Sequence, residues 1–269
     1  NSIGSLELSN GKFKNTQGIT QKSLTIKDSN TILESALGKL SIGNEIIANA
    51  GTLSLTGNND LTAVEFKHTL QGINGVLKLA DSVNIDVQGK VENTIENEGK
   101  LTITATNIGN RVTNTGELNL GAGTLVKDIK ADGETATKGT LIVTANVSNM
   151  ANITQNILKI ASAGGLTTDL AKLVISEDIE NKGTMTITAG TNLKNSILSD
   201  TTNDTVATDG TLLITGGNLQ AAEGVAIAQK TMTISTGSLE IDADALKIGD
   251  NEITNKGTLT FVDEGTLQE

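Results

Sequence analysis

The side chains that could carry out acid–base or nucleophilic chemistry in this chain are few. His68 is the only histidine and the chain has no cysteine, so a Ser-His-Asp triad would have to use His68. The lack of cysteine excludes disulfides, thiol chemistry and thiolate metal sites. His68 has the same parity as Val64 and Phe66, which places it at the end of an inward-facing row. We therefore expect a buried or corner histidine rather than a catalytic base.

Carboxylates offer two further kinds of chemistry, glycoside hydrolysis and calcium binding. Three acids alternate with apolar residues and would face outward on one strand, with about 7 Å between alternate residues: Glu240, Asp242 and Asp244. That spacing is compatible with a shared Ca²⁺, although a solvated face explains it more simply. The same holds for three acids in a polar stretch: Asp200, Asp204 and Asp209. Sugar sites normally need aromatic platforms, and the chain has neither Trp nor Tyr. The sequence therefore predicts no catalytic, cofactor-binding or metal-binding residues, no cofactor and no enzyme activity.

The elements that would position these residues come from one repeated phrase. Residues 95–103 (IENEGKLTI) read apolar-x-Asn-x-Gly-x-Leu-x-apolar, and the phrase returns at 47–55, 112–120, 179–187 and 253–261. Looser copies keep only the Gly-x-Leu-x-apolar half. A fixed phrase at intervals of roughly 13 to 27 residues is typical of a repeat array.

Within each phrase the alternation predicts a strand, as Leu101 and Ile103 would point inward while Thr102 and Thr104 point to water. Asn and Gly tolerate positive φ, so Asn-x-Gly predicts a sharp corner. A strand, a corner and a second strand would make one coil, and stacked coils would bury their apolar faces. We expect an all-β chain, a parallel β-helix of on the order of 13 coils and roughly 60 Å in length. The corner Asn of each coil should stack on that of the next. A leucine-rich repeat is the rival fold, but its Asn follows the strand and its spacing is more regular.

Composition supports the same fold and narrows the partners. The chain has no Pro, as expected where every central strand needs its N–H groups. Its net charge is −11, which argues against nucleic acid as a partner, and no run of 18 apolar residues predicts a membrane span. We see no signal peptide and no capping helix. We therefore expect residues 1–269 to form a single solenoid domain that is a segment of a longer protein, or a subunit with covered ends.

Two surface features could carry binding. The polar stretches 199–210 and 128–138 are the best candidates for protruding loops, where a solenoid usually carries its specificity. Outward threonines recur along the chain and would stack on one face if the coils are in register, as in ice-binding β-helices. Charged residues such as Lys100 and Glu117 interrupt that array, and Thr is a common outward residue of strands.

Phrases such as ITNKGTLTF and IENEGKLTI, in a chain free of Cys, resemble the passenger regions of bacterial autotransporters and filamentous-haemagglutinin-like adhesins. The resemblance covers nearly the whole chain and is one of repeat style. It implies a right-handed β-helix exported to the cell surface, with a ligand on a host or neighbouring cell. The family's signal peptide, C-terminal barrel and protease motif are not present in the sequence, and no family site residue carries over. Our leading hypothesis is a structural or adhesive stalk. The alternatives are an end-to-end homo-oligomeric filament subunit and a polysaccharide-acting enzyme.

Overall fold

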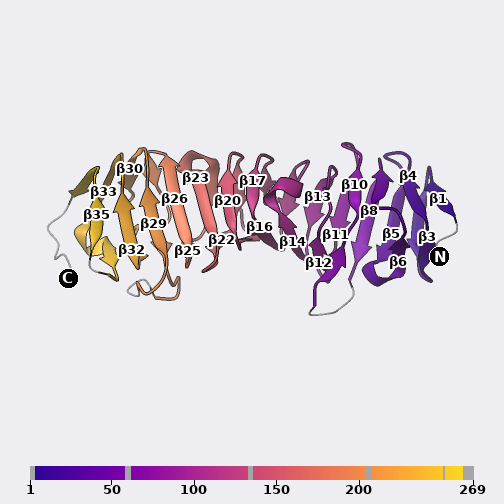
Figure 1. The fold of residues 1–269 in the computed structure, drawn as a ribbon, viewed down its shortest axis with the longest axis horizontal. Helices are drawn as coiled ribbons and strands as arrows, with labels where there is room; N and C mark the ends of the chain where they lie inside the picture. Colours follow the sequence, from indigo (N-terminus) through magenta and orange to yellow (C-terminus); the bar gives the residue numbers. More distant parts are fainter. Residues whose placement is uncertain (1–3, 58–61, 133–135, 204–206, 251, 263–269) are drawn as a thin grey trace.

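The computed structural model describes residues 4–57, 62–132, 136–203, 207–250 and 252–262. The chain forms a rod with its two ends at opposite tips and its strands lying across the long axis (Figure 1). It is an all-β solenoid of about 12 turns with parallel stacked coils, so the predicted fold class is confirmed and the coil number is close to the expected one.

Each complete coil contributes to three columns of strands rather than the two that the sequence suggested. We call these columns faces 1, 2 and 3, in chain order. Face 1 contains β1 (Ser5–Leu8), β4 (Ser23–Ile26), β7 (Ile46–Asn49), β10 (Thr69–Gln71), β17 (Gly123–Leu125), β20 (Asn146–Asn149), β23 (Gly165–Asp169), β26 (Thr184–Ala189), β29 (Thr211–Ile214), β32 (Thr231–Ile234) and β35 (Ile253–Asn255). Single bridges through Val91 and Ile108 continue this column beyond β10.

Face 2 is made of two sheets. The first contains β2 (Lys12–Asn15), β5 (Ile32–Ala36), β8 (Thr52–Thr56), β11 (Val76–Leu79), β13 (Thr94–Asn97), β15 (Val112–Asn114), β18 (Ile129–Lys130), β21 (Ile153–Gln155) and β24 (Leu173–Ile175). The second contains β27 (Asn192–Leu193), β30 (Asn218–Ala221), β33 (Ser238–Ile241) and β36 (Thr258–Phe261). The hydrogen-bonded order therefore breaks between β24 and β27.

Face 3 begins with the pair β3 (Ile19–Gln21) and β6 (Leu40–Ile42). It continues as one sheet of β9 (Val64–Phe66), β12 (Asn84–Val87), β14 (Lys100–Thr104), β16 (Glu117–Gly121), β19 (Thr140–Val143), β22 (Ile157–Ile160), β25 (Ile179–Asn181), β28 (Ile197–Leu198), β31 (Ile227–Gln229) and β34 (Leu246–Ile248). Four short 3₁₀ helices sit at corners: η1 (Leu37–Lys39), η2 (Ala105–Asn107), η3 (Leu170–Lys172) and η4 (Ala243–Ala245).

The core consists of aliphatic side chains stacked in register along the rod. On face 2 one such row contains Leu53, Leu77, Ile95, Val112, Ile129 and Ile153, all fully buried. Alternation along each strand supplies the row, because every second residue points inward. Burying one such side chain contributes about 1.5–3 kcal/mol, so the stack of rows holds the coils together.

Buried amides at the corners add hydrogen bonds between coils. Asn97 Nδ2 donates to Asn114 Oδ1 at 2.7 Å, and these residues are direct partners in the β13–β15 register. This pair confirms the predicted stacking of corner asparagines on the next coil. The amide of Asn97 begins this ladder, and its own Oδ1 is buried without a donor among the described residues.

The other long-range amide pairs skip a coil, so the prediction of strict neighbour-to-neighbour stacking is wrong for them. Asn114 Nδ2 donates to Gln155 Oε1 at 2.6 Å. The register Val112–Ile129–Ile153 places Ala131, which has no amide, on the coil between them. The small side chain of Ala131 leaves room for the two amides to meet across the middle coil.

The same arrangement occurs twice more. Asn181 Nδ2 donates to Gln229 Oε1 at 2.6 Å, and the strand registers place Ser199 between them. Asn49 Nδ2 donates to Asn93 Oδ1 at 2.7 Å across the coil that carries Gly72. In all three cases the skipped coil has a small residue where its neighbours have an amide, so the amide bridge keeps the outer coils connected.

Two skipped coils contain the longest insertions between strands, and each insertion ends in a glycine that the bridge requires. Gly139 and Gly210 have φ of +88° and +82°, which favour glycine. A Cβ on either residue would overlap the carbonyl oxygen of the bridging Asn and the Oε1 of the bridging Gln. The corner, the loop and the amide bridge therefore form one unit.

Candidate functional site

The break in face 2 between β24 and β27 creates the candidate site. Before β24 the chain turns through η3, where Asp169 caps the helix by accepting from the Ala171 N–H at 2.9 Å. Lys172 Nζ anchors the turn to the coil below by donating to the Met150 carbonyl at 2.8 Å. On the coil above, β27 pairs only upward, with β30. A groove therefore separates the two coils on this face.

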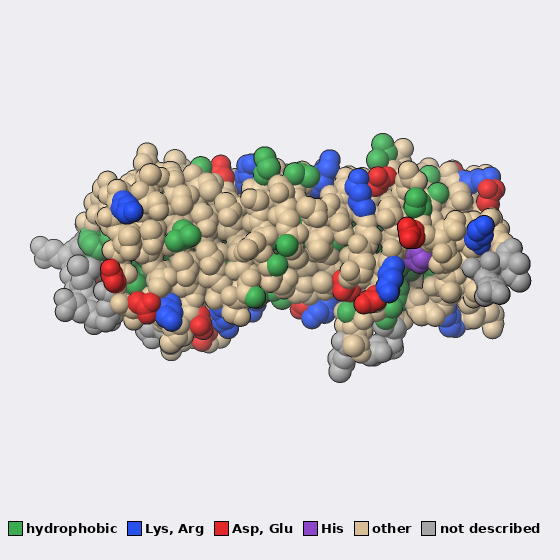
Figure 2. Space-filling model, in the orientation of Figure 1, with side chains coloured by type: hydrophobic (Ala, Val, Ile, Leu, Met, Phe, Trp, Pro, Cys, Tyr) green, Lys and Arg blue, Asp and Glu red, His purple; other side chains and the backbone are tan. Residues whose placement is uncertain are grey.

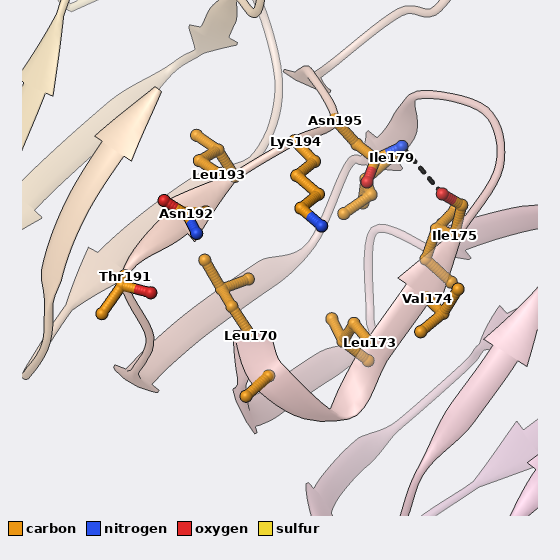
Figure 3. A pocket seen from close by; sticks show the side chains of 11 residues that line it. Leu170, Leu173, Val174, Ile175, Ile179, Thr191, Asn192, Leu193, Lys194 and Asn195 are labelled. Atoms are coloured by element: carbon orange, nitrogen blue, oxygen red, sulfur yellow. Dashed lines mark hydrogen bonds between the residues drawn. The ribbon is translucent and has the colours of Figure 1, made fainter. Parts of the chain in front are cut away.

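The groove has an apolar part with a volume of about 470 Å³. Its walls come from η3, β24, the first residue of β25 and the segment 191–195: Leu170, Ala171, Leu173, Val174, Ile175, Ile179, Thr191, Asn192, Leu193, Lys194 and Asn195. Figure 3 shows Leu170 and Leu173 on one side, with the Lys194 side chain extending toward them from the other. Asn195 Nδ2 closes one end by donating to the Ile175 carbonyl at 2.9 Å, the dashed line of Figure 3.

Around the corner lies a polar cavity, also of about 470 Å³, that shares Lys194 and Asn195 with the apolar part. Its acids are already engaged. Asp178 accepts from the Ser196 N–H at 3.0 Å, and Glu177 accepts from Asn156 Nδ2 at 2.9 Å. The polar cavity therefore presents carboxylates that hold the corner together.

Glu180 is the most buried acid of the polar cavity, and two lysines flank it. Lys159 and Lys182 each lie 2.8 Å from its carboxylate, whose side chain is 14 % exposed. Burial by itself raises the pKa of Glu180, but hydrogen bonds and charge from the two lysines outweigh it and lower the pKa. A general acid for glycoside cleavage needs a raised pKa, so Glu180 does not suit that role.

His68 lies at a corner, as predicted, and is half-buried between β9 and β10. Its Nδ1 lies 2.8 Å from the Asn44 carbonyl oxygen, and its ring packs edge-on against Phe66 with centroids 5.1 Å apart. Both contacts connect His68 to its own and the preceding coil. They give it a structural role.

The three acids expected on one outward strand are not on one strand, which corrects that prediction. β33 ends at Ile241, and the chain then turns into η4. Asp242 caps η4 by accepting from the Asp244 N–H at 3.0 Å, whereas Glu240 accepts from Gln220 Nε2 at 2.7 Å. A cap residue at the strand end breaks the outward row because its side chain turns back to the backbone.

The loop acids do not converge either, as far as the structure describes them. Asp200 accepts from both the N–H and the hydroxyl of Thr202, Asp209 is exposed, and Asp204 lies outside the described residues. In the described part of the chain, no group of three or more Asp, Glu or His side chains could hold a metal ion.

The threonine rows fall on different faces, so the prediction of one flat Thr array is wrong. Thr102 and Thr104 are on face 3, Thr184 and Thr231 on face 1, and Thr258 on face 2. The phrase that carries them occurs at different corners of the coil, so only the copies at 95–103 and 112–120, which share a corner, stack on each other.

The predicted loops are mostly where expected. Residues 199–210 connect β28 to β29, with 204–206 outside the described residues. The second loop is shorter than 128–138, because Ile129 and Lys130 form β18 and pair with β15. Residues 133–135 lie outside the described part.

Sequence reasoning did not find the groove. The available signal was the loss of the repeat phrase over 146–178, the stretch that contains η3 and β24. A lost phrase marks a coil whose corner departs from the common geometry, and here that departure opens the face.

Comparison of the chain with protein-family models, with curated proteins and with solved structures found no match. Among the described residues, no helix has the length and apolar character needed to cross a membrane.

Proposed function

We propose that this chain is a rigid solenoid stalk of a bacterial cell-surface or secreted protein, which holds loops and a lateral groove outward for binding. We assign no catalytic role to it. The observation that carries the proposal is the parallel stacking of coils with amide bridges across the coils that bear loops. Because such a bridge connects the coils on either side, a polar loop can protrude from the middle coil without interrupting the hydrogen bonding along the rod. The repeat style that resembles autotransporter passengers and filamentous adhesins supports the extracellular location.

The location and the adhesive role can be tested together. Antibodies raised against the purified chain should label intact cells that make the full-length protein, before any permeabilisation. Beads coated with the purified chain should adhere to host or neighbouring cells more than albumin-coated beads do. Labelling only after permeabilisation would refute the surface location, and equal adhesion of both beads would refute the adhesive role.

A second candidate function is end-to-end assembly of copies into a filament. One observation favours it: the inward residues Ile253, Leu259 and Phe261 of the last described coil are partly exposed, whereas their counterparts in the middle are fully buried. A following coil, from the same chain or from another copy, would cover them. Sedimentation and electron microscopy over a concentration series separate the two functions. Fibres of uniform width that grow with concentration indicate a filament subunit, and rods that stay monomeric indicate a stalk.

A further inference from the structure

The lower wall of the groove is a strand edge that no strand of the described chain covers. β24 pairs with β21 below it and ends its sheet. Alternate residues of a parallel strand bond to opposite neighbours. Since the Ser176 N–H bonds downward to the Gln155 carbonyl, the peptide groups of Leu173 and Ile175 face the groove. The Leu173 N–H already donates to the Leu170 carbonyl and the Ile175 carbonyl accepts from Asn195 Nδ2, which leaves the Leu173 carbonyl and the Ile175 N–H for a partner strand. The groove therefore offers main-chain groups to a further strand.

Apolar side chains extend from the groove along one edge of the rod. Val174 is 53 % exposed, and Met150 and Val126, at the corners of the two coils below, are 63 % and 56 % exposed. Figure 2 shows hydrophobic side chains at intervals along the upper edge of the rod, between charged ones. Exposed apolar residues that line up beside an open groove are typical of an interaction surface.

The charge of the groove differs from that of the molecule. The chain carries a net charge of −11, yet Lys194 is the only charged residue among the described residues that line the apolar part. Lys194 is exposed and forms no ion pair within the described chain. The neighbouring acids of the polar part are already engaged by Ser196, Asn156 and the two lysines around Glu180. An unpaired cation over an apolar floor favours an anionic, apolar ligand.

We propose that the groove binds a short extended peptide of a partner protein, in which apolar and acidic side chains alternate. Its main chain adds to the open edge of β24, its apolar side chains pack inward against Leu170 and Leu173, and an outward carboxylate pairs with Lys194. Strand addition supplies affinity through main-chain hydrogen bonds and specificity through alternate side chains. The inference deepens the proposed stalk function by naming its binding site, but its test uses purified chain and does not depend on where the protein resides.

The test is fluorescence anisotropy with a labelled synthetic pentapeptide that alternates isoleucine and glutamate. Saturable binding is expected, and Lys194→Glu should weaken it at least about fivefold, because it replaces an attraction with a repulsion. Val174→Glu should weaken it as well, because it places a like charge beside the outward carboxylates of the peptide. The matched control is Lys256→Glu, the same charge change at an exposed lysine of the last described coil. It should leave the affinity unchanged.

Three probes test whether the groove binds an extended acidic peptide rather than another kind of ligand. The same peptide with N-methyl groups on alternate amides should lose binding, since methylation removes the donors that a strand edge needs. A pentapeptide alternating isoleucine and lysine should bind at least about fivefold more weakly. Equal binding of either peptide, or no effect of Lys194→Glu, would overturn the proposal. Displacement of the acidic peptide by laurate at equal concentration would likewise overturn it in favour of a small amphiphile.

Discussion

Replacing Gln229 with alanine tests whether an amide that skips a coil stabilises the solenoid. Gln229 is fully buried, and its Oε1 accepts from Asn181 Nδ2 at 2.6 Å. The substitution removes that hydrogen bond and the one that Gln229 Nε2 donates to the Ala228 carbonyl at 2.8 Å, about 1 kcal/mol each, together with one buried methylene group, about 0.8 kcal/mol. We therefore expect the free energy of unfolding to fall by about 2–3 kcal/mol.

The measurement is equilibrium urea unfolding followed by far-UV circular dichroism, because the chain has no Trp or Tyr to report by fluorescence. Gln71→Ala is the matched control: this glutamine is exposed on β10, and its loss should change stability by less than about 0.5 kcal/mol. Hydrogen exchange of 179–199 and 227–231 should show faster exchange on both outer coils and on the skipped one in Gln229→Ala.

A double-mutant cycle with Asn181→Ala isolates the bridge from the loss of packing. We expect a coupling energy of about 1 kcal/mol between the two positions. If the effects of the two substitutions simply add, the 2.6 Å contact contributes nothing to stability and the bridging argument fails.

Three further predictions use the same urea titration. Gly210→Ala should cost more than about 2 kcal/mol, because its Cβ would overlap the corner of the preceding coil at a φ of +82°; an unchanged midpoint would contradict this. Glu180→Gln should cost about 1 kcal/mol at neutral pH. Burial raises the pKa of Glu180, but Lys159 and Lys182 outweigh it and lower the pKa below its ordinary value of 4.5. The stability that the ionised Glu180 contributes is therefore present above pH 4.5 and should be lost as the pH falls through the folded-state pKa. A stability difference between the two proteins that persists in strong acid would contradict the ion pairs. Leu118→Ala, at a fully buried position in mid-rod, should cost about 2–5 kcal/mol, and a cost below about 1 would show that the core is not close-packed there.

The strands were predictable because alternation is a strong local signal. Apolar residues alternate with polar ones around Leu6, Leu24, Leu40 and Leu53, and these segments form β1, β4, β6 and β8. The weaker alternating segments 64–68 and 83–87 contain β9 and β12. In every case the inward residue is the apolar member of the pair, since burial on one face of a strand fixes which residues must be apolar.

The number of faces was not predictable, because the repeat phrase specifies a kind of corner and not its place in the coil. Asn49 lies between faces 1 and 2, Asn97 between faces 2 and 3, and Asn181 between faces 3 and 1. Asn-x-Gly makes the same local turn at each of these places. Two phrases can therefore look alike and still fail to stack, which explains both the scattered threonines and the amides that skip coils.

The groove was not predictable for a related reason. A missing phrase indicates that a corner has changed, but the opening depends on how two successive coils stack on each other. Lys194 follows β27 and Leu170 belongs to the coil below, and only the stacked structure brings them to the same cavity. Long-range placement of this kind leaves no periodic signal.

The bridges that skip a coil also affect how the rod would respond to tension between its ends. Hydrogen bonds between stacked strands run along the long axis, so such a load pulls directly on them. Adjacent partners such as Leu212 and Met232 are 20 residues apart, and a detached coil of that length extends to about 65 Å in place of roughly 4.8 Å. Where an amide bridge spans three coils, the middle coil cannot leave alone. Extension should then proceed in unequal steps. Coils without a bridge should detach one at a time, whereas the coils joined by an amide bridge should detach together.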